Sequence, residues 1–427
     1  MGFNTALSGL NAAANMLSVT GNNIANANTS GFKHSRSEFA DVYASSMGGI
    51  GQTTPGSGVA IANVAQQFSQ GNLQSTGNSL DLAISGDGFF VLGESASNIA
   101  KRSYTRAGMF HADENGTVVS NTGQPLLVYS PNGTTVAEGF STGVYQALTL
   151  DTTQGEPKAS SLITTAVNLD ARKPAIDSTA YPFVGPVNGV VDPNSYTHSS
   201  SATVYDSLGN THISTQYYVK TATTNQWDVY TYVDGVDAGG TTPPAAPAPT
   251  ILTFDTNGKL TTPATGNIVY PPLTIAANAS PLNLTLDLSG STQVGSAFSV
   301  NALQQDGLPI GQLTSLDIND AGIVFARFSN GSSKPLGQVA LARFQNSQGL
   351  AKLGDTKWGE TTSSGQAVSG VAGAGTFGNI KAGSIEGSNV DLSAQLVNLI
   401  IAQQTYQANA QTITTENQIV QTLLNIR

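Results

Sequence analysis

The sequence contains short matches to ligand-binding motifs, but each match lacks a feature that the corresponding chemistry requires. A G-x-G-x-x-G match lies at residues 373–378, but it neither follows a clear strand nor opens a clear helix, as a pyrophosphate-binding turn must. Asp113, Asp255 and Asp317 begin turns that resemble calcium loops, yet no glutamate stands at the twelfth position of any of them. Dinucleotide and calcium binding are therefore disfavoured, and hairpin turns are expected at the aspartates.

The sequence also gives no sign of a histidine metal site, a reactive cysteine or a serine nucleophile. The four histidines show no ligand spacing with one another, which favours surface or turn positions, and the sequence has no cysteine. No G-x-S-x-G motif is present, and no pair of carboxylates stands out as the acid and base of a glycosidase. We therefore expect no catalytic residue, no cofactor and no metal, and we predict that the chain is not an enzyme.

Composition narrows the class of protein further. Charged residues make up 10% of the 427 residues, against about 25% in typical soluble domains. The net charge is −10 without a basic patch, so no nucleic-acid partner is expected. No run approaches about 18 consecutive apolar residues, and the N-terminus lacks the basic and apolar regions of a secretory signal. Neither membrane insertion nor a cleavable signal peptide is expected.

The elements at the two ends of the chain match each other. Residues 1–32 contain no Asp, Glu, Lys or Arg, and only Glu416 and Arg427 are charged from Leu392 onward. Apolar residues recur every seven positions in both regions, as in a coiled-coil seam. The predicted seam consists of Phe3, Leu7, Leu10, Ala14, Leu17 and Ile24 at one end and Leu392, Leu396, Leu399, Tyr406, Ile413, Val420 and Leu424 at the other.

Helices are expected over residues 4–27 and 392–427, and the seams suggest that they pair. Ser388, with Asp391 three residues later, resembles a capping box at the start of the second helix. The N-terminal helix contains two glycines and many Asn and Ser residues, so packing must stabilise it. An intramolecular hairpin and contacts with other copies of the chain both fit the heptads, and the sequence pattern leaves both open.

Strand and turn signals dominate the sequence between these ends. The expected fold class is mixed but mostly β, with two nested β-rich domains, inner and outer, inserted between N- and C-terminal helices that pair as a coiled coil. The predicted ranges are residues 1–30 and 388–427 for the helices, 31–72 and 364–387 for a connector, 73–150 and 291–363 for the inner β domain, and 151–290 for the outer β domain.

Motifs spread along the chain resemble those of bacterial flagellar rod and hook proteins. The N-terminal ones are ALSGLNAA at 6–13, TGNNIAN at 20–26, TSGFK at 29–33 and SGDGFF at 85–90. The C-terminal ones are EGSNVDL at 386–392 and QTYQANA at 404–410. Segments typical of the hook members are similar to residues 35–43, 169–171 and 204–212.

This resemblance implies a structural subunit of the flagellar hook. In that family the subunits polymerise into a curved, flexible helical tube that transmits torque from the motor and rod to the filament and provides a central export channel. The implied partners are other copies of the chain, the distal rod, the hook cap, the hook–filament junction proteins and the type III export apparatus. The implied location is the extracellular hook, reached without a cleavable signal peptide.

Other interpretations stay open at this stage. Another axial component, such as a distal rod or hook-associated protein, would share the terminal motifs. A secreted β-rich adhesin or a carbohydrate-active enzyme belongs to a different class. An adhesin need not have matching heptads at both ends, and an enzyme would depend on one or two polar residues.

Overall fold

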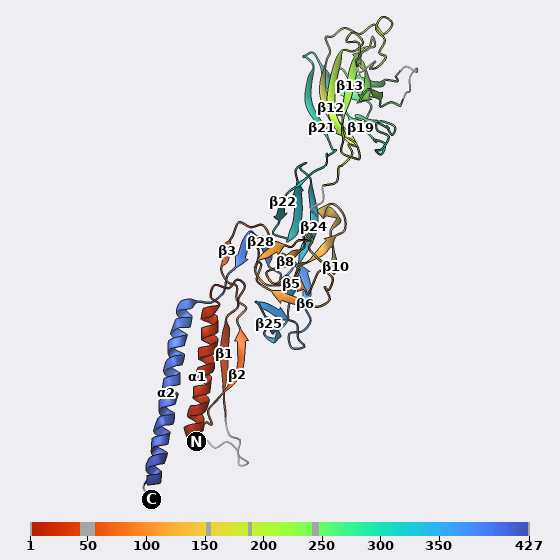
Figure 1. Cartoon of the computed structure of the whole chain (residues 1–427). Coiled ribbons are helices and arrows are strands. Elements are labelled where there is room, and N and C mark those ends of the chain that lie inside the picture. Colours follow the sequence, from red (N-terminus) through yellow and green to blue (C-terminus); the bar gives the residue numbers. More distant parts are fainter. Residues whose placement is uncertain (1, 43–55, 151–154, 187–189, 241–246, 426–427) are drawn as a thin grey trace. The chain divides into compact units, whose positions relative to one another are not determined.

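The computed structural model describes residues 2–42, 56–150, 155–186, 190–240 and 247–425 (Figure 1). The chain divides into two compact units. The first comprises Met1–Thr152, Ser315–Arg327 and Ser333–Arg427, and the second comprises Thr153–Thr314 and Phe328–Ser332. The second unit is thus inserted into the first. The predicted fold class, mostly β with terminal helices that pack together, is confirmed.

The described residues form two α-helices, α1 (Gly2–Ala25) and α2 (Leu392–Asn425), which lie side by side (Figure 1). The cap of α2 is Asp391, whose Oδ1 accepts hydrogen bonds from the backbone N–H groups of Ser393 and Ala394 at 2.9 and 3.1 Å. The predicted capping residue Ser388 accepts instead from Val390, ahead of the helix. Ser388 lies too far upstream of Leu392 to reach the first helical N–H groups, so that prediction is wrong.

A β-hairpin lies along α1 where the sequence predicted only a connector (Figure 1). It consists of β1 (Ser35–Asp41) and β2 (Val59–Gln66), paired antiparallel with a bulge between Glu38 and Phe39. Most of its residues are at least partly exposed, so it lacks the alternation that identifies a strand in a sequence. Two short pairs follow: β3 (Leu73–Ser75) with β29 (Ser384–Glu386), and β4 (Leu82–Ser85) with β28 (Asn379–Ala382).

The described residues of the first unit also form a ten-stranded sheet with the central order β10-β9-β24-β5-β6-β26-β25. Its strands are β5 (Phe89–Gly93), β6 (Arg102–Thr105), β9 (Leu127–Pro131), β10 (Phe140–Ala147), β22 (Leu313–Ile318), β23 (Ile323–Phe328), β24 (Ser333–Arg343), β25 (Ala351–Gly354), β26 (Lys357–Gly359) and β27 (Val368–Val371). Beside it lie the pair β7 (Phe110–Ala112) and β8 (Val118–Ser120) and the short 3₁₀ helices η1 (Val136–Glu138) and η2 (Ser347–Gly349).

Successive side chains of β5 enter two different cores, because side chains alternate along a strand. Phe90 packs in one core with residues such as Leu82 and Leu341. Phe89 packs in the other with Tyr104, Trp358 and their neighbours. The SGDGFF segment therefore anchors the sheet from both faces.

The second unit packs two sheets around one apolar core. One sheet contains β11 (Leu162–Asp170), β18 (Asn267–Val269), β19 (Thr285–Asp287), β20 (Thr292–Val294) and β21 (Ser299–Gln305). The other contains β12 (His198–Tyr205), β13 (Thr211–Lys220), β14 (Gln226–Val233), β15 (Val236–Asp237), β16 (Thr250–Phe254) and β17 (Leu260–Thr262). Trp227 is fully buried between them, and its indole N–H donates to Gln293 Oε1 at 2.9 Å.

The boundary of the inserted unit differs from the range expected from the sequence. The inner β domain was expected to resume at residue 291, whereas the second unit extends to Thr314. The reason is that β20 and β21 both pair with β11, parallel and antiparallel respectively. Strand β21 is largely exposed, so its sequence gives little sign of which sheet it joins.

Candidate assembly interface

The two terminal helices meet through small and polar side chains. A Cβ atom placed on Gly9 would lie only 2.6 Å from Asn409 Oδ1, so α1 and α2 approach closely at this point. Ala13 of α1 and Ala402 of α2 are buried. Asn23 of α1 contacts two other elements: its Nδ2 donates to Gln395 Oε1 of α2 at 3.2 Å and to the backbone oxygen of Ser35 of β1 at 2.8 Å. The most buried points on the two helices are thus small or polar residues.

Most of the predicted seam residues lie outside this contact. Leu10, Leu17, Ile24, Leu399 and Ile413 are partly buried. Those that lie exposed are Phe3, Leu7, Ala14, Leu392, Leu396, Tyr406, Val420 and Leu424. Additional apolar residues of α2 that the heptad pattern did not select are also exposed, namely Val397, Ile400, Ile401 and Ile419. The helix pair thus presents a long apolar surface to solvent.

This surface is almost free of charge. No Asp, Glu, Lys or Arg lies in α1, and Glu416 is the only one in α2. No helix in the described part of the chain is long and apolar enough to span a membrane. Large exposed apolar surfaces on such elements mark sites of association.

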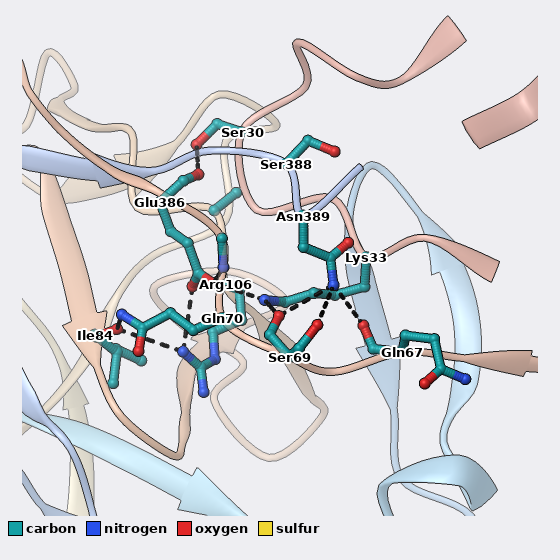
Figure 2. Close-up of polar contacts among 12 residues, drawn as sticks. Ser30, Lys33, Gln67, Ser69, Gln70, Ile84, Arg106, Glu386, Ser388 and Asn389 are labelled. Carbon is teal, nitrogen blue, oxygen red and sulfur yellow. Dashed lines mark hydrogen bonds and ion pairs between the residues drawn. The ribbon is translucent and has the colours of Figure 1, made fainter. Parts of the chain in front are cut away.

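A group of polar residues, most of them buried, connects the helix pair to the β-strands of the first unit (Figure 2). We call it the junction cluster, and it consists of Ser30, Lys33, Ser69, Arg106, Glu386 and Asn389. Its members come from the segment after α1, the segment after β2, the turn after β6, and the segment from β29 to α2. It therefore joins four parts of the chain that are far apart in sequence.

Glu386 is the centre of the junction cluster (Figure 2). Its Oε1 accepts from Lys33 Nζ at 2.6 Å and from the Gly71 N–H at 2.8 Å, and its Oε2 accepts from Arg106 Nη1 at 3.2 Å. Its backbone oxygen accepts from the Gly31 N–H at 2.8 Å. The side chains of Lys33 and Glu386 are both 0% exposed. Burial of these ions is tolerated because each one is paired and hydrogen-bonded.

Asn389 holds the chain just ahead of α2. Its Nδ2 donates to the backbone oxygens of Gln67 and Ser69 at 2.7 and 3.1 Å, and its Oδ1 accepts from the His34 N–H at 2.8 Å. Lys33 Nζ donates to the same Ser69 oxygen at 2.7 Å. The segment that leaves α1 and the segment that enters α2 are thereby fixed on one stretch of backbone.

The electrostatics of the junction cluster are unbalanced. Two cations, Lys33 and Arg106, face one carboxylate, that of Glu386. Burial is the largest influence on Lys33 and lowers its pKa, while the charge and hydrogen bond of Glu386 oppose that effect. The sequence motifs contained Lys33 and Glu386, but nothing in the sequence indicated that residues so far apart would pair. The one available signal was the position of Lys33, which is the first charged residue after the uncharged N-terminal region.

Histidine placement differs from the sequence expectation most clearly at His212. His212 is buried rather than on the surface, with Nδ1 2.7 Å from Asp234 Oδ2 and Nε2 3.3 Å from Asp206 Oδ2. Among the described residues no group of His, Cys, Asp and Glu side chains is arranged to hold a metal ion. Residues 373–378 form a turn between β27 and β28, not a strand-to-helix turn.

Matches to known protein families show the class of protein to which the chain belongs. Residues 3–33 match the flagella basal body rod protein family, and residues 381–426 match the C-terminal family of flagellar basal body rod FlgEFG proteins. Residues 83–156 match the flagellar hook protein FlgE/F/G D1 domain, and residues 168–308 match the flagellar basal body protein FlaE D2 domain. The paired ends and both β units thus place the chain among the flagellar rod and hook proteins.

Full-length relatives are more specific. The chain is 41% identical over 429 residues to the flagellar hook protein FlgE of Salmonella typhimurium, with 100% of both chains covered. It is 40% identical over 431 residues to that of Escherichia coli, again with 100% of both covered, and 33% identical over 457 residues to that of Borreliella burgdorferi, with 99% and 98% covered. A crystal structure of Helicobacter pylori flagellar hook protein FlgE2 covers 72% of this chain and 99% of its own at 17% identity, with a TM-score of 0.49.

The chain belongs to the flagellar hook protein family and is a subunit of the hook. It is a structural protein, and the prediction that it is not an enzyme is confirmed by this membership. Full-length similarity to hook proteins favours the hook over the rod and hook-associated alternatives.

Proposed function

We propose that the chain polymerises into a curved, flexible helical tube that transmits torque from the rod to the filament and encloses an export channel. The observation that carries this proposal is the exposed apolar surface of the terminal helices. The contact between α1 and α2 uses residues such as Gly9, Ala13 and Ala402, whereas large side chains such as Leu396 and Tyr406 face solvent. Burying one such side chain stabilises an assembly by about 1.5–3 kcal/mol.

The partner of this surface is a second copy of the chain. The heptad seam of α2 continues over its whole length, which suits repeated contact with the same helix from neighbouring subunits. Because the surface carries almost no charge, its partner need not carry charges of opposite sign, and an identical surface on another copy fits it. The seam residues from Phe3 to Leu424 therefore form the core of the proposed tube.

We assign further roles to the other parts of the chain within the same proposal. The β-strands of the first unit stack along protofilaments, and the second unit contacts neighbours on the outside of the tube. The distal rod, the hook cap and the hook–filament junction proteins bind at the ends of the tube. The type III export apparatus delivers the chain to the extracellular hook without a cleavable signal peptide.

Polymerisation is tested by placing a charge in the apolar surface. Tyr406→Asp buries a carboxylate in the assembled seam, and we expect it to raise the critical concentration for tube formation about 100-fold. Gln407→Asp is the matched control, because it puts the same charge on an adjacent, exposed and already polar position. Sedimentation and electron microscopy measure the result. Normal curved tubes from the Tyr406→Asp chain would contradict the assigned role of the seam.

The role of the second unit is tested by its removal. Gly155 and Gly311 exchange backbone hydrogen bonds of 2.8 and 3.3 Å, so a short Gly-Ser link between them replaces residues 156–310 without stretching the chain. We expect tubes that are straight or irregularly curved, because the helices and the first unit are left in place. Tubes of normal curvature would show that the second unit does not set the curve.

A further inference from the structure

The first unit contains a cavity of about 550 Å³ next to the junction cluster. Its walls are the end of α1 and the segment that follows it, the turn after β6, residues 120–122 and the β25–β26 hairpin. Hydroxyl and amide side chains make up half of the lining residues, including Asn22, Asn121 and Thr356. The family assignment does not account for this recess.

The cavity carries surplus positive charge in a chain whose net charge is −10. Lys352 Nζ donates to Ser35 Oγ at 3.1 Å, and among the described residues it pairs with no carboxylate. Partial burial lowers its pKa. Lys357 lies 3.5 Å from the exposed carboxylate of Asp355, and Lys33 is already paired with Glu386. One ammonium group, that of Lys352, is therefore left without a counter-charge.

The rim of the cavity is a strained turn. Asp355 and Thr356 connect β25 to β26 with φ of 48° and 55°, the left-handed region that a β-branched residue rarely adopts. The backbone oxygen of Thr356 accepts from Thr105 Oγ1 at 2.9 Å, which fixes the turn against the wall. Strain of this kind persists where the local shape is needed for a function.

A complementary group lies elsewhere on the same unit. Asp113 and Glu114 are the only two adjacent acidic residues in the sequence, and they form the turn between β7 and β8. Asp113 Oδ1 is used within the turn, where it accepts from the N–H groups of Asn115 and Thr117. Glu114 is exposed and makes no hydrogen bond or ion pair among the described residues.

Glu114 is not among the residues that line the cavity of its own chain. It precedes β8, whereas Ser120 and Asn121 at the far end of β8 belong to the cavity wall. An exposed acidic turn and a basic recess that do not meet within one copy suit a head-to-tail contact between copies.

We propose that this cavity receives the Asp113–Glu114 turn of a second copy, with Glu114 pairing with Lys352. The proposal rests on polymerisation of the chain and adds one specific contact to it. The cavity is large enough for a turn of two or three residues, and its hydroxyl and amide groups can replace the water around the entering backbone.

Zero-length carbodiimide cross-linking of assembled tubes tests the contact directly. Tubes made from equal parts of ¹⁵N-labelled and unlabelled chain distinguish links between copies from links within a copy. We expect a mixed-label peptide pair joining Lys352 to Glu114 in tubes and not in monomers. Tubes in which Lys352 is unlinked and as reactive toward amine reagents as in the monomer would overturn this proposal alone. Failure of the unmodified chain to form tubes would overturn both this proposal and polymerisation.

A charge swap provides the second test. We expect Lys352→Glu and Glu114→Lys each to raise the critical concentration about fivefold, and the double variant to recover most of that loss. Lys381→Glu, an exposed lysine on β28, is the matched control for net charge. Melting of the monomers checks that each variant folds. Additive losses in the double variant would overturn the pairing.

Discussion

The junction cluster allows a graded prediction from its charge balance. Lys33 and Arg106 face the single carboxylate of Glu386 in a site where the Lys33 and Glu386 side chains are 0% exposed. Lys33→Met removes the surplus cation and leaves the Arg106–Glu386 pair intact. Glu386→Gln instead leaves two buried cations with no anion between them. Each substitution removes one charge. Lys33→Met makes the net charge of the site zero, whereas Glu386→Gln makes the site more positive.

The expected magnitudes follow from this difference. Lys33→Met loses hydrogen bonds to Glu386 and to the Ser69 backbone oxygen, which costs about 2 kcal/mol. Glu386→Gln leaves uncompensated buried charge, for which about 3–5 kcal/mol is typical. At about 1.4 kcal/mol per factor of ten, local opening increases roughly 30-fold in the first case and more than about 100-fold in the second.

Native-state hydrogen exchange of the full chain measures the opening. The reporting amides are Gly31, which donates to Glu386 O, and Gly387, which donates to Asn72 O. Lys381→Met, at an exposed position, is the control and should change neither amide. If Lys33→Met accelerates exchange as much as Glu386→Gln does, the charge-balance argument is refuted.

Three further predictions concern pH and backbone conformation. Burial opposes protonation of His212, but its hydrogen bonds to Asp234 and Asp206 prevail and raise its pKa. The stability that His212 contributes to the second unit is therefore complete below pH ~6.5 and is lost as pH rises through the raised pKa. His212→Gln should flatten this pH dependence of the melting temperature. Gly31→Ala should cost about 3 kcal/mol, because φ is 70° and the new Cβ would lie 2.4 Å from the Ala107 nitrogen, whereas Gly77→Ala, with φ of 76° and open space, should cost only about 1 kcal/mol by denaturant unfolding. Thr356→Gly should raise the unfolding free energy by about 1 kcal/mol, since glycine adopts φ of 55° without strain, and an unchanged melting temperature would remove the argument for strain at that turn.

The parts of the fold that the sequence predicted are those with strong local signals. The helices α1 and α2 follow from heptads that extend over many turns, and the Asn-Gly and Asp-containing turns separate recognisable strands. The hairpin β1–β2 escaped prediction because its residues are mostly exposed and gain their order from α1. The extent of the second unit was missed because the partner of β21 is β11, far away in the sequence.

The candidate assembly interface also depends on contacts that no local sequence pattern predicts. A heptad pattern identifies the apolar positions of a helix, but it does not say whether the partner lies in the same chain. The structure partly buries Leu399 and Ile413 and leaves Leu396 and Tyr406 exposed. The pairing of Lys33 with Glu386 joins residues 353 positions apart, and no local pattern encodes such a contact.

The division between small and large side chains on the terminal helices explains how folding and assembly can be separate events. If Leu396 and Tyr406 filled the contact between α1 and α2, a subunit would have to open that contact before it could join a neighbour. Close approach at Gly9 and Ala402 instead leaves these side chains available in the folded subunit. The junction cluster then determines where the helices leave the β-strands, because Glu386 and Asn389 bond to the segments on both sides. The helices therefore present the apolar surface to a neighbouring subunit from a fixed position. Because this surface is not already buried in the monomer, its burial on assembly can stabilise the polymer.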